Sequence, residues 1–280
     1  MLSSDLTSLM SGFRRTKDPT LLFRAAWLSL RQGRIPEIAR SALAELVLHP
    51  SPVAECPECL IGEVFRKVDP CLGCTFSRED LSGRFGKRFN SLPDDFQGTR
   101  WSCVCPLEGA TVIGEYFEEK RVFLVGDGFC HESRHYHGQS DVRHIHSIVR
   151  RGNELLVSTG DARKALDLWR VENGRPVFKK RIRKHSAGYT AAVDAGRDIY
   201  FGTDFSSRAN WIETLNGARH PYPGESYRCY VEAMQCMDDR FVVSVNKSKL
   251  QKGRKIWSVF DAVRGGFLYC GGFIGQDPTT

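Results

Sequence analysis

The sequence predicts a mainly β fold, a β-propeller-like array of four visible blade repeats over residues 101–280. Two observations predict it. A strand–turn–strand unit recurs four times, with its copies 42 to 46 residues apart. Each repeat also has room for four short strands, and four short strands in about 40 to 50 residues make one propeller blade. We expect a small α-helical hairpin at residues 1–50 and a Cys-rich segment with a linker at residues 51–100 to precede the array.

Two helices are predicted in the first 50 residues. Residues 20–32 form an apolar helical stretch that stops at Gly33, and helical spacing of apolar residues resumes at Pro36 and stops at Pro50. Proline is favoured at the first position of a helix, and glycine just beyond its end. Two helices joined by a short turn make an αα-hairpin, which we expect to pack on the rest of the protein.

Two Cys-x-x-Cys pairs follow, Cys56 with Cys59 and Cys71 with Cys74. Zinc prefers four soft ligands in a tetrahedron, and each pair can offer two thiolates to one ion. We therefore expect a structural zinc on which the four sulfurs converge. An iron–sulfur cluster, a redox dithiol and four unrelated thiols are the alternatives. Residues 77–100 carry Gly, Pro, Asp and Ser scattered among charges and are interpreted as a linker.

The repeat unit is an apolar strand that ends at an acidic or amide residue, followed by a polar turn and a second strand. The copies of the first strand end at Glu115, Asp161, Asp204 and Asn246. We expect these four anchors to occupy equivalent positions. Eight residues after the first three anchors come Phe123, Trp169 and Ile212 in the second strand.

The repeats leave the closure of the ring open. Many propellers close with six or seven blades. Either this ring closes with four blades, or the N-terminal segment supplies further strands, or the array is open. An open array exposes strand edges, which favour aggregation unless they are covered. The hairpin at residues 1–50 is a candidate for such a cover.

Composition and charge narrow the class of protein only moderately. The chain is 41% hydrophobic and 26% charged, as soluble globular proteins are, and it has no apolar run long enough to span a membrane. We see no secretory signal and expect a cytoplasmic protein whose ten cysteines are thiols or metal ligands. The net charge of +7 permits an acidic partner but does not require one.

Four motifs resemble a bacterial group of sialidase-like six-bladed β-propellers. They are residues 114–117 (Gly-Glu-Tyr-Phe), 144–147 (His-Ile-His-Ser), 158–161 (Ser-Thr-Gly-Asp) and 201–204 (Phe-Gly-Thr-Asp), within a match over about residues 110–216. The resemblance implies a propeller fold and a link to carbohydrate chemistry. Sialidase-type enzymes use three arginines, a Tyr–Glu pair and Asp boxes, none of which can be placed here, so glycosidase activity does not follow.

Histidines are concentrated before and within the second repeat. Five of the eight lie at positions 131 to 146. His144 and His146 share one face of a strand because alternate side chains point the same way. We expect both to face the central channel or a cleft beside Asp161, with Ile145 and Ser147 on the other face. His131, His135 and His137 are interpreted as part of a solvated loop.

Three kinds of side chain are candidates for ligand contact. The pair of His144 and His146 could bind a ligand, or hold a divalent metal with Asp161 or Glu115. Asp161 and Asp204 could face a ligand as carboxylates, although capping the turn that leaves each strand explains them equally well. The basic run at residues 179–185 could contact phosphate or an anionic glycan, but a solvated strand edge is the simpler interpretation.

Three functions remain open. The first is a propeller-type binding protein for a glycan or protein partner, without a catalytic set. The second is a carbohydrate-active enzyme, a glycoside hydrolase or metal-assisted polysaccharide lyase, with His144, His146, Asp161 and Tyr189 as catalytic candidates. The third is a zinc-stabilised protein associated with nucleic acid, which would use the Cys pairs and the basic run; a nucleic-acid partner is not the expected one. Whether the chain is an enzyme stays undecided at this point, as do its ligand and its oligomeric state.

Overall fold

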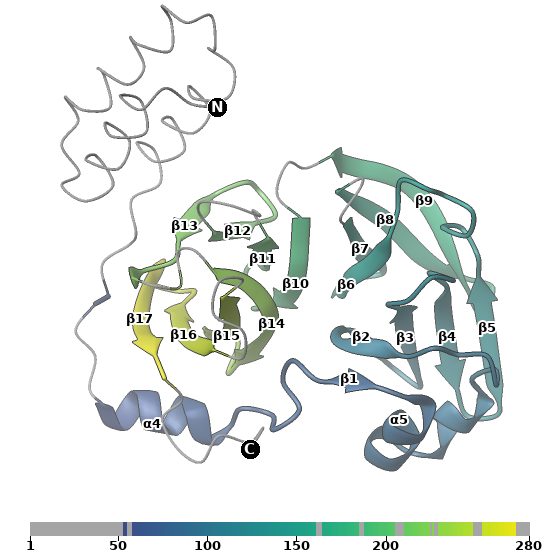
Figure 1. Cartoon of the computed structure of the whole chain (residues 1–280), viewed down its shortest axis with the longest axis horizontal. Coiled ribbons are helices and arrows are strands. Elements are labelled where there is room, and N and C mark those ends of the chain that lie inside the picture. Colours follow the sequence, from purple (N-terminus) through teal and green to yellow (C-terminus); the bar gives the residue numbers. More distant parts are fainter. Residues whose placement is uncertain are drawn as a thin grey trace, which may run out of the picture. The chain divides into compact units, whose positions relative to one another are not determined.

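The computed structural model describes residues 53–54, 58–160, 164–184, 188–204, 210–224, 226, 229–248 and 254–272 (Figure 1). The chain divides into two compact units, Met1–His49 and Pro50–Thr280. The predicted hairpin of residues 1–50 lies outside the described residues. The Cys-rich segment and the repeats belong to the same unit, so the expected boundary at residue 100 does not separate two compact bodies.

The second unit is a four-bladed β-propeller, which confirms the fold class predicted from the repeats. Its described strands form four antiparallel sheets, each with its strands in chain order. The first sheet comprises β1 (Thr75–Phe76), β2 (Thr99–Leu107), β3 (Ala110–Glu115), β4 (Val122–Gly126) and β5 (Phe129–Ser133). The second comprises β6 (His144–Arg151), β7 (Glu154–Gly160), β8 (Ala165–Glu172) and β9 (Arg175–Lys184).

The third and fourth sheets repeat this arrangement (Figure 1). The third comprises β10 (Gly188–Asp194), β11 (Ile199–Asp204), β12 (Trp211–Thr214) and β13 (Arg219–Pro221). The fourth comprises β14 (Cys229–Met237), β15 (Phe241–Ser248), β16 (Lys255–Asp261) and β17 (Gly266–Gly271). The described part of the chain thus has four blades, in agreement with the four repeats visible in the sequence.

The inner strands are β2, β6, β10 and β14. Side chains from all four line one cavity on the propeller axis. Those of β6, β10 and β14 come from the second half of the strand, and those of β2 lie between Trp101 and Pro106. The four inner strands therefore run in the same direction along the channel. Their first residues meet at the opposite end, which is where the sequence placed its histidine pair.

Apolar clusters fill the space between neighbouring sheets. Alternate residues of a strand point to opposite faces, so each sheet offers one apolar set to each neighbour. Three interfaces are built in this way. One apolar cluster includes Val112 and Ile148, a second includes Leu166 and Phe201, and a third includes Ile212 and Val242. The remaining faces of the first and fourth sheets are covered by helices.

Two helices and a 3-10 turn cover the terminal sheets. From α4 (Glu58–Arg66), Val64 and Phe65 pack with Trp257 of the fourth sheet. From α5 (Arg78–Phe85) and η1 (Lys87–Ser91), Leu81 and Phe89 pack with Phe123 of the first sheet. The apolar faces of the two terminal sheets are therefore shielded by residues 58–91. The hairpin of residues 1–50 was a candidate cover for exposed strand edges, and it lies outside the described residues.

The segment interpreted as a linker, residues 77–100, is mostly ordered structure. The N-terminus of α5 has a capping box, in which the Ser77 hydroxyl accepts a hydrogen bond from the Asp80 amide (3.1 Å) and the Asp80 carboxylate accepts one from the Ser77 amide (2.9 Å). Such reciprocal bonds satisfy helix donors that otherwise lack partners. Leu81, Phe89 and Leu92 are buried. The polar composition concealed this helix because its apolar residues are few.

The described repeat anchors lie in corresponding strands of their sheets, the strand that follows the inner one. Glu115 and Asp204 end β3 and β11, and Asn246 lies near the end of β15. Asp161 follows β7 directly and lies outside the described residues. The positions of Asn246 and Asp204 in these strands differ by one residue. Asn246 pairs with the residue before a β-bulge, as Thr203 does, so Asn246 matches Thr203 and not Asp204.

The spacing of eight residues corresponds to the same strand pairing in two of the three copies. Phe123 and Ile212 pair with residues two positions before their anchors, Ile113 and Gly202. Trp169 pairs instead with Leu155, six positions before Asp161. The connection between β7 and β8 is shorter than those between β3 and β4 and between β11 and β12. Equal spacing in the sequence therefore does not give equal strand register.

Candidate functional site

The candidate site is the end of the channel where the inner strands begin, here called the histidine end. Among the described residues it includes Arg100 of β2, Tyr116 after β3, His144 of β6, Lys164 before β8 and Tyr230 of β14. These side chains come from three of the four sheets. All of them are partly exposed, as a binding surface requires.

Three of these side chains form a stack. The Arg100 guanidinium lies over the Tyr116 ring, 3.8 Å from its centroid. Tyr116 stacks in turn on His144, with ring centroids 4.4 Å apart and 14° between the planes. A cation over a tyrosine ring gains about 0.5–2 kcal/mol, and stacking restricts both planar groups to few orientations. The stack therefore holds a guanidinium and an imidazole in place at the channel end.

Arg100 has a second property that matters for recognition. It makes no ion pair with any residue that the structure describes, although the residue is partly buried. Arginine presents a rigid set of donors that matches a carboxylate bidentately. A stacked arginine without an acidic partner in the described chain is suited to receive an anionic group from outside.

His146 lies deeper than His144. Its ring centroid is 5.5 Å from that of His144, but the side chain is only 5% exposed. It packs against Gly160 of β7, and Gly188 of β10 lies within 4 Å of its Nδ1 when a Cβ is placed on that glycine. The structure thus brings the two histidines side by side while leaving only His144 at the surface.

The expected alternation around the pair is wrong. Ile145 packs on Gly114 of the first sheet, whereas Ser147 contacts Ser158 (Oγ to Oγ, 2.6 Å), which donates to the Tyr189 carbonyl of the third sheet. The two residues therefore face opposite neighbours. The reason is a β-bulge between Ile145 and Ser147, which inserts one extra residue and breaks the period of two.

Glu115, a predicted ligand-binding residue, is fully buried. Its carboxylate accepts two hydrogen bonds from Arg121 (2.8 and 2.9 Å) and one from the Gln97 amide (2.9 Å). Arg121 also binds Asp95 (2.9 Å), and the bonds to Glu115 raise the pKa of its guanidinium. The arrangement attaches residues 95–97 to the first sheet, so the Glu115 carboxylate is enclosed by protein.

Asp204 lies at the histidine end, half-exposed, and its carbonyl accepts a hydrogen bond from Lys164 (3.1 Å). Burial, and then the nearby Glu232 carboxylate, raise the pKa of Tyr230, and Asp204 and Tyr116 add to this effect. The phenol is therefore a neutral hydrogen-bond donor near physiological pH. Lys247 pairs with Glu232 in the same region. Asp161, predicted beside the histidines, lies outside the described residues.

Tyr189, a catalytic candidate, is buried between the second and third sheets. It is 1% exposed and stacks on Phe201 with centroids 4.4 Å apart. Its hydroxyl donates to Glu213 (2.9 Å) and accepts from Arg183 (2.8 Å). Burial raises the pKa of the phenol above its usual range. The structure thus does not bring this hydroxyl to the surface that carries His144.

The predicted zinc ligands are only partly described. Cys71 and Cys74 are half-buried neighbours, and the Cys74 amide donates to the Cys71 carbonyl (2.8 Å). Burial, and then Cys71, raise the pKa of Cys74. Cys59 is exposed on α4, and Cys56 lies outside the described residues. Within the described ranges no three His, Cys, Asp or Glu side chains are placed to hold one metal ion. The zinc site stays a prediction.

The other histidines and the basic run have structural contacts. His135 stacks on Phe178 with centroids 3.8 Å apart, so it is more than a solvated loop residue. In the basic run, Arg181 binds the buried carboxylate of Asp167 (2.7 and 3.0 Å) and Arg183 binds Glu213 (3.0 Å). These two arginines therefore neutralise internal carboxylates.

Sequence reasoning missed Arg100, Lys164 and Tyr230. Arg100 stands at the start of an inner strand inside the segment interpreted as a linker, and Lys164 and Tyr230 belong to no motif. Tyr116 was present in the sialidase-like motif at residues 114–117. Its stacking on His144 joins two sheets and could not be read from either segment alone.

Comparisons with known proteins give only distant similarity. No protein-family model matches the chain, and no curated protein matches it. The computationally designed Ika4 protein is 14% identical, with a TM-score of 0.37, over 57% of this chain and 89% of that one. None of the helices in the described ranges is long and apolar enough to cross a membrane.

Two further solved structures are similar at the same level. The β-propeller domain of Myceliophteria thermophila Cps50 (Swd1) is 15% identical, with a TM-score of 0.39, over 62% of this chain and 55% of that one. Prolyl oligopeptidase B from Galerina marginata is 11% identical, with a TM-score of 0.39, over 61% of this chain and 27% of that one. The chain spans little more than half of the first and about a quarter of the second, and these values are too low for a functional inference.

Proposed function

We propose that this propeller is a binding protein that docks a protein partner at the histidine end, through an acidic side chain of the partner. The observation that carries the proposal is Arg100, stacked 3.8 Å over Tyr116 and without an ion pair in the described chain. A guanidinium held by stacking loses less conformational freedom on binding than a mobile one. An acidic side chain is the group it is best arranged to receive.

The neighbouring side chains fit the same partner. His144 and Lys164 add donors on two further elements, and the Tyr230 phenol is neutral. The net charge of +7 favours approach of an acidic surface. The Tyr116 ring is engaged by Arg100 and His144, so a sugar ring has less opportunity to stack on it. These features favour a protein partner over a glycan.

The enzyme hypothesis has less support. Of its four catalytic candidates, Tyr189 and His146 are buried, and Tyr189 is bound to Glu213 and Arg183. Only His144 of the described candidates lies at the surface of the histidine end. A general acid or base must reach the substrate proton it transfers. The arrangement supports recognition better than acid–base chemistry.

The test begins with a displayed library of random peptides selected on the purified protein. We expect acidic peptides to be enriched and to bind less tightly as salt is raised. Binding of one labelled selected peptide is then measured by fluorescence anisotropy. Arg100→Gln should weaken it about tenfold or more, because a charged hydrogen bond is lost. Arg66→Gln is the matched control, since that arginine is exposed on α4.

Three outcomes would reject the proposal. Equal binding by the Arg100→Gln variant and the unchanged protein would exclude the stacked arginine. Binding of an anionic oligosaccharide that depends on Arg100, with no acidic peptide selected, would favour the glycan alternative. Cleavage of that oligosaccharide would favour the enzyme.

A further inference from the structure

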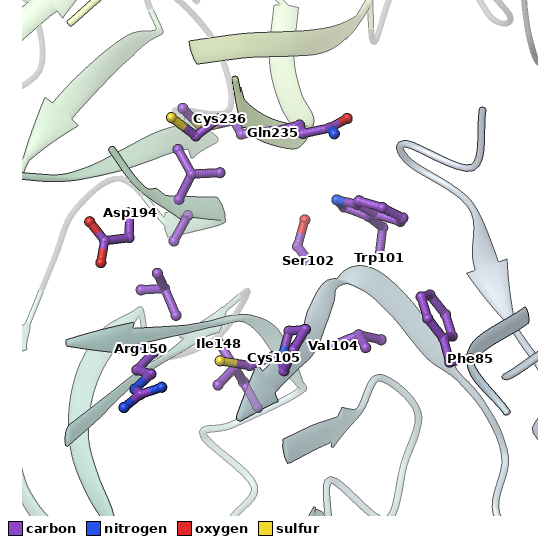
Figure 2. A pocket seen from close by; sticks show the side chains of 15 residues that line it. Phe85, Trp101, Ser102, Val104, Cys105, Ile148, Arg150, Asp194, Gln235 and Cys236 are labelled. Carbon is purple, nitrogen blue, oxygen red and sulfur yellow. The ribbon is translucent and has the colours of Figure 1, made fainter. Parts of the chain in front are cut away.

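A cavity of about 270 Å³ lies in the channel at the end opposite to the histidines. All four inner strands contribute to it, and Phe85 of α5 adds to the lining beside the first sheet (Figure 2). Pockets for drug-sized molecules span about 300–1,000 Å³, so this one suits a smaller ligand. None of the side chains of the histidine end lines it.

Most of the cavity wall is apolar. Ring and aliphatic side chains line it, together with two thiols: Phe85, Trp101, Val104, Ile148, Val193, Met234, Cys105 and Cys236. Burial raises the pKa of Cys105 and of Cys236 to about 11, so both thiols are neutral near physiological pH. Such a wall accepts a flat apolar group by the hydrophobic effect and dispersion.

Two lining side chains away from the rim charges are polar, Ser102 and Gln235, and the Gln235 amide oxygen accepts a hydrogen bond from the Asp69 amide (2.9 Å). Ser102 is 7% exposed, and its hydroxyl oxygen has no hydrogen-bond partner among the described residues. Figure 2 shows this hydroxyl directed into the space between the lining side chains. A buried hydroxyl without a partner costs about 1–3 kcal/mol, and such groups in native proteins call for an explanation. A ligand that hydrogen-bonds to Ser102 supplies one.

Two opposite charges stand at the rim. Arg150 is the last residue of β6 that lines the cavity, and Asp194 is the last one of β10 (Figure 2). Each is exposed, and each makes a local bond to the main chain: Arg150 Nε to the Gly152 carbonyl (2.8 Å), and the Gly196 amide to Asp194 Oδ1 (2.9 Å). In the described chain they form no ion pair with each other. Both charges are therefore accessible to a ligand.

We propose that the cavity binds a zwitterionic amino acid with an aromatic side chain that carries a ring donor. The ring enters the apolar part and donates to the Ser102 hydroxyl. The ligand carboxylate faces Arg150, and its ammonium group faces Asp194. This assignment uses the size of the cavity, its apolar wall, the Ser102 hydroxyl and both rim charges. It does not rest on the function proposed for the histidine end.

The experiment is calorimetric titration of the whole chain with free L-tryptophan. Binding should be saturable, and L-phenylalanine, which lacks a ring donor, should bind about threefold to tenfold more weakly. Ser102→Ala should weaken tryptophan binding to the level of phenylalanine while leaving phenylalanine unaffected. Arg150→Gln and Asp194→Asn should each weaken both amino acids about tenfold. Arg66→Gln, exposed on α4, should change nothing.

Uncharged and modified probes decide the remaining points. N-acetyl-L-tryptophanamide keeps the ring but loses both charges, and it should bind at least about tenfold more weakly than L-tryptophan. Equal binding of the two would overturn the zwitterion assignment and point to an aromatic side chain of a peptide. Absence of saturable tryptophan binding, or equal binding by the Ser102→Ala variant, would overturn the proposal. Melting temperatures of the variants confirm that each is folded.

Discussion

The imidazole of His146 occupies the space that a side chain at Gly160 would need, because a Cβ on Gly160 would overlap the ring. The two residues lie on adjacent strands, β6 and β7, at the β-bulge that interrupts their pairing. The ring is thereby enclosed and 5% exposed. His146 therefore fills space between strands, while its neighbour His144 carries the surface contact.

Replacing Gly160 should destabilise the propeller. Gly160→Ala should lower the free energy of unfolding by about 1–3 kcal/mol, because overpacking forces the imidazole out of its place. Chemical denaturation measures this loss. Combining it with His146→Ala should restore part of the stability, and additive losses in the double variant would show that the two side chains do not compete for space.

For His146→Ala alone, the enclosed position of the ring predicts a larger loss of stability than a position facing the channel would. A histidine facing a wet channel could be removed with little change in the melting temperature. The buried ring should instead cost about 1–3 kcal/mol of stability when truncated, because a cavity remains. Thermal denaturation measures it, with His144→Ala as the partly exposed control. An unchanged melting temperature would contradict the enclosed position.

The substitutions Ser102→Ala and Ser158→Ala give a matched comparison, because both remove a buried hydroxyl. Ser158 is buried and its hydroxyl donates to the Tyr189 carbonyl (2.6 Å), so Ser158→Ala should cost about 1–3 kcal/mol. Ser102→Ala removes a buried hydroxyl with no partner in the described chain, so the ligand-free protein should be as stable as before, or more so. Denaturant midpoints compare the two, and a large loss for Ser102→Ala would reveal a protein partner.

The Glu115–Arg121 pair should be essential to the first sheet. Both side chains are at most 1% exposed, and removing one partner leaves a buried charge. Glu115→Ala should therefore lower the free energy of unfolding by about 3–5 kcal/mol. Asp95→Ala should have a much smaller effect, since that carboxylate is 67% exposed. Comparable losses in the two variants, measured by denaturation, would contradict this ranking.

Stability should fall as pH is lowered through the histidine range. Burial lowers the pKa of His135 and of His220, so the folded state binds protons less readily than the unfolded chain. Their contribution to stability is fully present above the unfolded pKa of about 6.5 and is lost as pH falls toward the folded values. Melting temperatures between about pH 8 and pH 5 measure this loss. His135→Phe, which keeps a ring beside Phe178, should reduce the slope, and an unchanged slope would exclude His135 as a source.

The zinc prediction is checked by elemental analysis of the purified chain. Convergence of Cys56, Cys59, Cys71 and Cys74 predicts one zinc ion per chain and its loss in Cys74→Ser. A fully stable chain without metal would favour separate thiols.

The sequence by itself determined the number and kind of the blades. The recurrence of apolar strands every 42 to 46 residues reflects a local rule, alternation with a period of two between turns, which short segments express on their own. The strands β3, β11 and β15, which carry Glu115, Asp204 and Asn246, were found in this way. Their register was not, because turn length and bulges depend on how neighbouring sheets pack.

The tertiary structure alone decided what covers the terminal sheets and where the sites lie. The apolar face of α5 consists of a few residues whose meaning appears only when Leu81 and Phe89 meet Phe123 of the first sheet. The stack joins Arg100 and Tyr116 of the first sheet to His144 of the second, and Ser102 is distinguished only by the absence of a described partner. Contacts between distant segments depend on the packing of whole sheets, which no local pattern encodes.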